Sequence, residues 1–433
     1  MDGVASPPPI GRTSGDEELD EPVLIPMSWP VGRHFQVENL LFRGHRSFSY
    51  DLSHGTNRLP TSPTIRKALQ SVSDRSPEIL CYDHPCGNQE LRSRIAAYES
   101  MMLGGSITAD DVVICAGARE ALHWTYSFVA SRPGVIGVLT LGPQYPVVHG
   151  AIQSAGLTVH EGLGGVNNCF EFSVEAATQW IKAGGEARAV HLTIPGNPSG
   201  RLLRDPELLQ IVTAVSTAGS ILIVDKVCSD IPTEANPAMP RVLGMAGALG
   251  MAERIIVVDS FSKRRSLPGL RIGYAACTDA QFSRWIGNRL YGGTQVGLGL
   301  TGLLEDLADS CAVLSGNQST PNNSTFSCMS ANHLTIRRNL DLALDALGPW
   351  IARSSPLESG QNVLIQLEST SAESDVELVG LMLDQGVAVL PLTCFSARQD
   401  LPKEAHLCLR VTLSTPADEF TQAVERVRVG LSS

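Results

Sequence analysis

The chain has 433 residues, of which 43% are hydrophobic and 18% are charged. This is a globular rather than a disordered composition, and the length allows roughly two or three compact units. The formal net charge is −11 at pH 7, and no long run of lysine and arginine is present, so neither a nucleic-acid partner nor an anionic membrane surface is expected.

The first segment, residues 1–30, combines three consecutive prolines, a Gly/Ser stretch and the acidic run Asp16-Glu17-Glu18. Such a composition offers too little apolar surface to offset the entropy of ordering the chain. We predict a disordered N-terminal arm.

Short apolar runs alternate with helical patterns through the middle of the chain. The predicted strands are Val112–Cys115, Val135–Thr140, Ala189–Thr193, Ser220–Val224, Ile255–Asp259 and Ile272–Ala276. The predicted helices are Glu120–Ala130, Pro146–Ser154, Ser173–Lys182 and Pro206–Ala218. This alternation is typical of βαβ units and of a mostly parallel sheet with helices packed on it, an α/β fold.

The pattern changes near residue 309. Ser, Thr, Asn and Gly gather in residues 309–330, which predicts an irregular surface insertion or hinge. The elements that follow indicate a small α+β unit, and they are the helix His333–Leu347, the strand Val363–Leu367, the helix Asp375–Asp384, the strands Val387–Pro391 and Leu407–Leu413, and the helix Ala417–Val429.

Four polar residues lie at or near the ends of predicted strands. Asp225 ends one strand, Asn197 follows another within Pro-Gly-Asn-Pro-Ser-Gly, and Lys263 follows a third. Arg271 comes eight residues after Lys263 (271 − 263). Ligands of open α/β sheets bind beyond the carboxyl ends of the strands. Taken singly, each residue has an ordinary alternative: a helix cap, a turn or a surface charge.

Together, the motif Ser-x-Ser-Lys, the run Pro-Gly-Leu-Arg-Ile-Gly-Tyr, the strand-end Asp and the Asn-Pro-Ser-Gly turn resemble the fold-type I pyridoxal 5′-phosphate (PLP) enzymes of the class I/II aminotransferase family. The Leu-Pro-Gly-Leu-Arg-Ile-Gly run also resembles 1-aminocyclopropane-1-carboxylate synthase-like proteins. The resemblance covers roughly residues 50–430. It implies a large domain with a mostly parallel seven-stranded sheet and a smaller C-terminal α+β domain. The implied division is an arm at 1–30, a small-domain segment at 31–75, a PLP-binding domain at 76–308, a hinge at 309–330 and the C-terminal domain at 331–433.

The resemblance also implies roles around the PLP ring. Lys263 would hold the cofactor as a Schiff base and then act as general acid and base at the substrate Cα. Asp225 would pair with the protonated pyridine nitrogen, and Asn197 would donate to the ring oxygen. The aromatic ring of Tyr145, in Gly-Pro-Gln-Tyr-Pro, would stack on the pyridine.

Other residues would bind the phosphate and the substrate. The phosphate ligands implied by the resemblance are Arg271, Ser260, Ser262 and the helix start Gly117, Ala118 and Arg119. Tyr82 is similar to the tyrosine that reaches the partner's phosphate across a dimer interface, which implies a homodimer. Arg410 resembles the arginine that binds the substrate α-carboxylate.

Two residues depart from the family pattern Asp-Glu-Val-Tyr. Cys228 takes the place of the tyrosine that hydrogen-bonds the ring oxygen, and a thiol is a weak donor. Lys226 replaces the acidic residue, and we expect it to be solvated at the surface. These departures leave alternatives open. The first expectation is an aminotransferase acting on an α-amino acid, in specialised metabolism. A carbon–sulfur β-lyase acting on a cysteine conjugate, or a non-catalytic ligand-binding protein of the same fold, would also fit.

Ten cysteines are scattered along the chain without a Cys-x-x-Cys pair. Free thiols in a reducing compartment are the simplest interpretation. No apolar run approaches the ~20 residues needed to span a bilayer, and no secretory signal is visible. A cytoplasmic protein that acts on small molecules is therefore expected.

Overall fold

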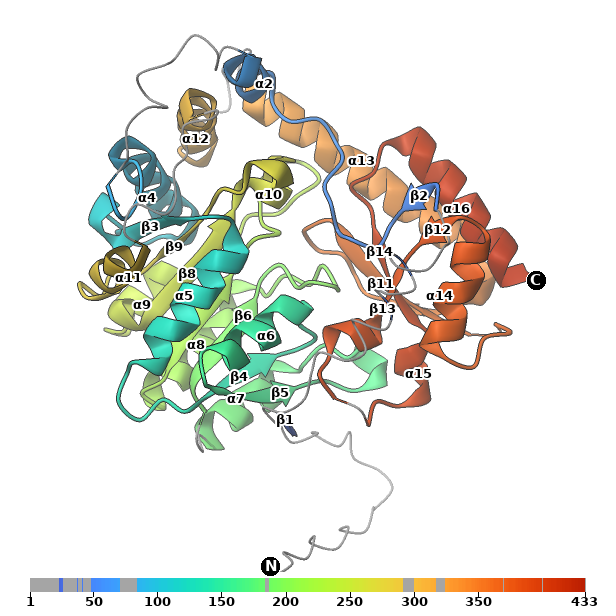
Figure 1. Cartoon of the computed structure of the whole chain (residues 1–433), viewed down its shortest axis with the longest axis horizontal. Coiled ribbons are helices and arrows are strands. Elements are labelled where there is room, and N and C mark those ends of the chain that lie inside the picture. The colour runs from blue at the N-terminus through green and yellow to red at the C-terminus, as the bar shows by residue number, and fades with distance from the viewer. Residues whose placement is uncertain are drawn as a thin grey trace, which may run out of the picture.

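A computed structural model describes residues 23–25, 37, 41, 48–70, 84–183, 187–290, 300–316, 324–368, 370–398 and 400–432. Figure 1 shows two sheets with their helices on either side of the molecule, and the long helix α13, Ser324–Leu347, running between them. None of the described helices is both long enough and apolar enough to cross a membrane.

The larger sheet has eight strands in the order β1-β5-β4-β6-β7-β8-β9-β3. Neighbouring strands are parallel from β5 to β8, β9 runs antiparallel to both β8 and β3, and β1 pairs antiparallel with β5. The strands are β1 Val23–Ile25, β3 Val112–Cys115, β4 Gly137–Leu141, β5 Thr158–Gly162, β6 Ala187–Thr193, β7 Ile221–Asp225, β8 Ile255–Ser260 and β9 Gly273–Ala276.

Helices cover both faces of this sheet, and both faces of its strands are accordingly apolar. In β3, for example, Val112 and Ile114 pack on one face, while Val113 and Cys115 pack on the other. The first face is covered by α4 Gln89–Leu103, α7 Val174–Ala183, α8 Asp205–Thr217, α9 Val242–Ala248 and α12 Leu300–Leu314. The second is covered by α5 Ala118–Ala130, α6 Pro146–Ser154 and α11 Phe282–Leu290.

The smaller unit has its own hydrophobic core, which contains residues from 37–59 and from 336–431. Its four-stranded sheet, in the order β10-β11-β14-β13, consists of β10 Ile351–Ser354, β11 Asn362–Leu367, β14 Cys408–Thr412 and β13 Leu390–Pro391. A second, two-stranded sheet joins β2 Tyr50–Asp51 to β12 Val387–Ala388. The remaining helices are α2 Pro63–Gln70, α10 Phe261–Arg264, α14 Asp375–Asp384, α15 Lys403–His406 and α16 Ala417–Ser432.

The structure corrects four expectations. The predicted disordered arm contains β1, because its residues hydrogen-bond to the open edge of β5. The sheet therefore has eight strands rather than the seven that the resemblance implies. Residues 309–330 were expected to be irregular, yet α12 continues to Leu314 and α13 already begins at Ser324, because both helices bury apolar residues in the main core. Lys226 is fully buried rather than solvated, because two buried carboxylates neutralise it.

Candidate active site

A cavity of about 430 Å³ lies at the carboxyl ends of β6, β7 and β8. It gathers ten of the predicted site residues, namely Ala118, Arg119, Tyr145, Asn197, Asp225, Ser260, Ser262, Lys263, Arg271 and Arg410. These residues come from both units of the fold, since Arg410 belongs to β14. The polar residues predicted at the strand ends thus lie together in one cavity.

Lys263 lies in the short helix α10, which begins directly after β8. Its Nζ donates to the main-chain oxygen of Gly55 at 2.5 Å, and its own carbonyl accepts from Asn57 Nδ2 at 2.7 Å. Burial lowers the pKa of Lys263 to about 8, and the nearby charges of Arg410 and Arg271 also lower it. An appreciable share of this amine is therefore unprotonated near neutral pH and available as a nucleophile.

Asp225 ends β7 and is 6% exposed. Its Oδ1 accepts from the Val227 amide at 3.0 Å. Burial raises the pKa of Asp225 to about 7. A carboxylate kept in such surroundings is stabilised by a positively charged partner placed in the cavity.

Arg271 presents a guanidinium to the cavity from a backbone in the left-handed region, with φ of 54°. Its Nη1 donates to the Pro268 oxygen and its Nη2 to the Ala116 oxygen, both at 3.1 Å. Gly117 lies directly beneath this guanidinium, and a Cβ at that position would overlap it. The glycine thus makes room for the arginine rather than lining the cavity itself.

The residues that line the cavity beside Arg271 also suit an anion. Helix α5 begins at Ala118, so the amides of Ala118 and Arg119 belong to its first turn, where helical N–H groups have no intrahelical acceptor. Ser260 caps α10 by accepting from the Ser262 amide at 3.3 Å. Hydroxyl groups, helix N–H groups and a guanidinium together form a phosphate-sized set of donors.

Arg410 is 1% exposed, and its Nε and Nη2 have no hydrogen-bond partner among the described residues. Its Nη1 donates to Asn197 Oδ1 at 3.4 Å, and its guanidinium carbon lies 4.7 Å from the centre of the Phe395 ring. Burial lowers the pKa of Arg410 to about 10. A buried cation with two unsatisfied N–H groups is the complement of a carboxylate.

Two of the predicted residues do not line the cavity. One is Gly117, and the other is Cys228. Cys228 is buried close to Lys263, and burial raises the pKa of its thiol to about 12. This thiol therefore stays protonated. The expected contact of Tyr82 lies outside the described residues.

Residues of the N-terminal segment that were not predicted as site residues also line the cavity, among them His54 and Gly55. Asp51, at the end of β2, organises their loop: its Oδ1 accepts from the Ser53 amide at 2.8 Å, and its Oδ2 accepts from His54 Nδ1 at 2.8 Å. Burial raises the pKa of Asp51, but the hydrogen bonds from His54 and Ser53 together outweigh it and hold the pKa well below its usual range. The Asp-Leu-Ser-His-Gly sequence could have been recognised as an Asp-led turn.

A buried string of polar side chains runs behind the cavity wall. Tyr126 Oη lies 2.7 Å from His191 Nδ1, His191 Nε2 lies 3.1 Å from Thr193 Oγ1, and Thr193 Oγ1 donates to Gln144 Oε1 at 2.8 Å. Burial lowers the pKa of His191 to about 3, so its ring is neutral and carries one proton. Because the Thr193 hydrogen is used on Gln144, Nε2–H must donate to Thr193, and Tyr126 must donate to Nδ1.

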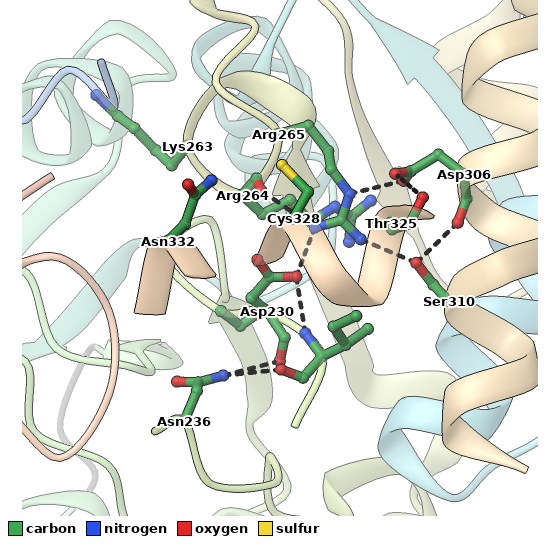
Figure 2. A network of polar contacts seen from close by, with 12 residues as sticks. Asp230, Asn236, Lys263, Arg264, Arg265, Asp306, Ser310, Thr325, Cys328 and Asn332 are labelled. Carbon is green, nitrogen blue, oxygen red and sulfur yellow. Dashed lines mark hydrogen bonds and ion pairs between the residues drawn. The ribbon is translucent and has the colours of Figure 1, made fainter. Parts of the chain in front are cut away.

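A second buried network anchors α10, the short helix that carries Lys263. In Figure 2, the side chain of Lys263, in α10, and that of Arg265, the residue directly after this helix, point in opposite directions. Arg265 donates to Asp306 Oδ2 at 2.6 Å, to Asp230 Oδ1 at 2.5 Å and to Ser310 Oγ at 2.9 Å. These contacts fix the lysine-bearing segment to α12 and to the loop after β7.

A larger groove, of about 950 Å³, lies away from this cavity. Arg337, which lines this groove, donates to the main-chain oxygens of Ala235, Leu357 and Glu358. All of these contacts are internal to the fold. The smaller cavity, which holds unsatisfied donors, is the better candidate for chemistry.

The chain is similar to known proteins in sequence and in fold. The sequence model of the family described as "Aminotransferase class I and II" matches residues 49–427. Probable aminotransferase TAT2 of Arabidopsis thaliana is 28% identical over 220 residues, 50% of this chain and 50% of that protein. Arginine–pyruvate transaminase AruH of Pseudomonas aeruginosa is 25% identical over 372 residues, 84% of this chain and 85% of that protein. In the first curated relatives, the matched stretch spans about half of their length.

Solved structures show the fold. The aspartate aminotransferase of Thermus thermophilus with maleate superposes with a TM-score of 0.73 at 20% identity, covering 92% of this chain and 94% of that chain. Pyrococcus protein-A1 superposes with a TM-score of 0.75 at 19% identity, covering 92% and 95%. With the family match over most of its length, the chain belongs to the class I and II aminotransferases, a family of PLP-dependent enzymes with the fold-type I architecture.

Proposed function

We propose that this protein is a PLP-dependent aminotransferase acting on an α-amino acid. The observation that carries the proposal is the shared cavity of three complementary groups: the Lys263 amine, the buried Asp225 carboxylate and the partly unsatisfied Arg410 guanidinium.

The residues present fit the cofactor. The phosphate would be held by Arg271 and its neighbours in the cavity, Ser260, Ser262, Ala118 and Arg119. Asp225 would face the pyridine nitrogen, because burial raises the pKa of this carboxyl and a nearby cation would stabilise its ionised form. Asn197 would face the ring oxygen and Tyr145 the ring plane. Cys228 would act on the site through its proximity to Lys263 rather than by lining the cavity.

Bound PLP supplies an electron-withdrawing ring that stabilises negative charge at the substrate Cα. The chain's own residues do the rest. Arg410 binds the α-carboxylate through its Nε and Nη2 and so orients the Cα–H bond. Lys263 Nζ, with its pKa lowered to about 8, takes the proton from Cα and returns it. Asp225 would stabilise a positive charge on the ring nitrogen.

The experiment is a donor panel on the purified protein with PLP. Borohydride reduction followed by peptide mass spectrometry is expected to place the cofactor on Lys263, and Lys263→Ala should abolish turnover. An aminotransferase converts an amino donor to its keto acid and then requires an acceptor. Release of a thiol, pyruvate and ammonia from a cysteine conjugate without any acceptor would instead establish the β-lyase. Failure to form a reducible chromophore would favour a ligand-binding protein.

We also propose a homodimer with Tyr82 near the partner's phosphate site, and a reducing, cytoplasmic location. The family resemblance supports the dimer, and the described cysteines, all of them free, support the location. A monomer in sedimentation at micromolar concentration would contradict the dimer.

A further inference from the structure

A cluster of buried charges lies directly behind the proposed site. It consists of Lys226, Asp259, Arg264 and Glu99, together with the phenol of Tyr274, and all five side chains are inaccessible to solvent or nearly so. We call it the Asp259 cluster. It contains two cations and two carboxylates, so its formal charge is balanced.

One oxygen atom is the centre of this cluster. Asp259 Oδ2 accepts from Lys226 Nζ at 2.6 Å and from Arg264 Nη1 at 2.8 Å. Tyr274 Oη lies 3.1 Å from the same oxygen, and its single hydrogen is shared with Glu99 Oε1, which is nearer at 2.5 Å. The other oxygen, Oδ1, accepts from the Ser260 amide at 2.6 Å. A single carboxylate thus joins the loop after β7, the end of β8, helix α10 and strand β9.

The partners of this carboxylate are chain neighbours of the proposed functional residues. Lys226 directly follows Asp225, and Arg264 directly follows Lys263. The main chain has no freedom to separate such neighbours by more than one residue's length. By binding Asp259, the Lys226 and Arg264 side chains therefore restrain the two stretches of main chain that carry the carboxylate and the amine of the site.

Glu99, from α4, completes the charge balance. Its Oε1 lies 3.1 Å from Lys226 Nζ, and the Tyr98 ring lies beneath both cations, 5.2 Å from Lys226 Nζ and 4.6 Å from the guanidinium carbon of Arg264. Burial raises the pKa of Glu99, while the Lys226 charge lowers it. The charges of Asp259 and Glu99 raise the pKa of Lys226 although burial acts in the opposite direction.

We propose that Lys226 and Arg264 are positioning residues, which hold the Asp225 carboxylate and the Lys263 amine at a fixed separation by binding the same oxygen of Asp259. Glu99 has a different role: it neutralises the second buried cation. This inference rests on the proposed function, because the separation matters only if both groups act on one bound molecule.

The test compares Lys226→Met with Lys226→Met/Glu99→Gln. The single variant leaves Glu99 buried without its cation, so both stability and positioning should suffer. The double variant restores the charge balance with Arg264 and Asp259 alone, so its melting temperature should return toward that of the wild type. Its cofactor parameters should not return: we expect a PLP Kd raised roughly tenfold or more, a displaced pH titration of the bound-cofactor absorbance, and a kcat lowered roughly tenfold or more. The KM for the amino acid should change little, since Arg410 is untouched.

Three further variants keep the test decisive. Lys226→Arg should recover most of the cofactor parameters. Glu99→Gln, which retains the contact between Lys226 and Asp259, should leave the titration midpoint in place and is the variant to use if Lys226→Met does not fold. Glu161→Gln alters an equally buried carboxylate on β5 and controls for general destabilisation.

The inference is overturned if the double variant regains wild-type cofactor binding and titration, or if Lys226→Met lowers only the melting temperature. Absence of a borohydride-reducible cofactor on Lys263 in the wild type would overturn the proposed function instead.

Discussion

Replacing Arg410 by methionine should weaken substrate binding and at the same time stabilise the protein in the absence of substrate. Methionine removes the charge and keeps an unbranched chain that can fill much of the same space. The two effects have opposite signs because the guanidinium is buried with Nε and Nη2 unpaired.

The magnitudes follow from the geometry. Two charged hydrogen bonds to an α-carboxylate contribute about 1.5–3 kcal/mol each, so kcat/KM should fall by roughly two to four powers of ten. Burial lowers the pKa of Arg410 to about 10, which corresponds to a cost of about 3 kcal/mol for keeping the charge inside. Methionine also loses the 3.4 Å hydrogen bond to Asn197, which costs about 1 kcal/mol and offsets part of the stability gained by removing the buried charge.

The assay measures kcat/KM for an amino donor, and the melting temperature of the PLP-bound protein without substrate. We expect a large kinetic loss together with an unchanged or higher melting temperature. A melting temperature that drops by several degrees while KM stays at its wild-type value would refute the reasoning, because Arg410 would then be a structural cation that is satisfied without substrate.

Three further outcomes are expected. In the apoprotein, the pKa of Lys263 is about 8, below the ~10.4 of an unfolded lysine, so the unfolded chain binds more protons between these pH values. The free energy of unfolding, measured in urea, should therefore rise by up to about 3 kcal/mol from pH 8 to 10. Lys263→Met should remove this rise. Gly117→Ala should displace Arg271 and raise the Kd for PLP by roughly tenfold or more, whereas Gly134→Ala, which has a similar positive φ and open space around its Cβ, should not. His54→Gln should change the ratio of kcat/KM between polar and aliphatic amino donors by up to about tenfold, and identical ratios would exclude a contact with the substrate side chain.

Much of the fold could be predicted because its strands are short, buried and apolar. Helices Pro146–Ser154 and Asp375–Asp384 have the predicted bounds. Strand β5 was missed, because its sequence Thr-Val-His-Glu-Gly carries polar residues that find partners only after folding, as Glu161 does with Ser396. The start of α13 was placed too late, because its first turns are rich in Ser, Thr and Asn, which have modest helix propensity and are held by tertiary packing.

The candidate site divides in the same way. Residues at strand ends, such as Asp225 and Lys263, could be placed together from local sequence, because parallel strands deliver their carboxyl ends to one edge. The surroundings of Lys226 could not, since its counter-charge Glu99 is 127 residues away in the chain (226 − 99). Cys228 was assigned by its place in a motif, yet it lies behind the cavity wall. Motif position predicts which strand end a residue follows, and packing decides which way its side chain points.

The polar string behind Asp225 has one permitted arrangement of hydrogen atoms. The phenolic hydrogen of Tyr126 is committed to His191, and each later donor is committed to the next acceptor as far as Gln144. A proton entering at one end would have to charge the His191 ring, whose pKa of about 3 forbids it near neutral pH. The string therefore does not carry protons near neutral pH. Because Asp225 lines the cavity, a molecule that fills the cavity would separate this carboxylate from bulk water on that side.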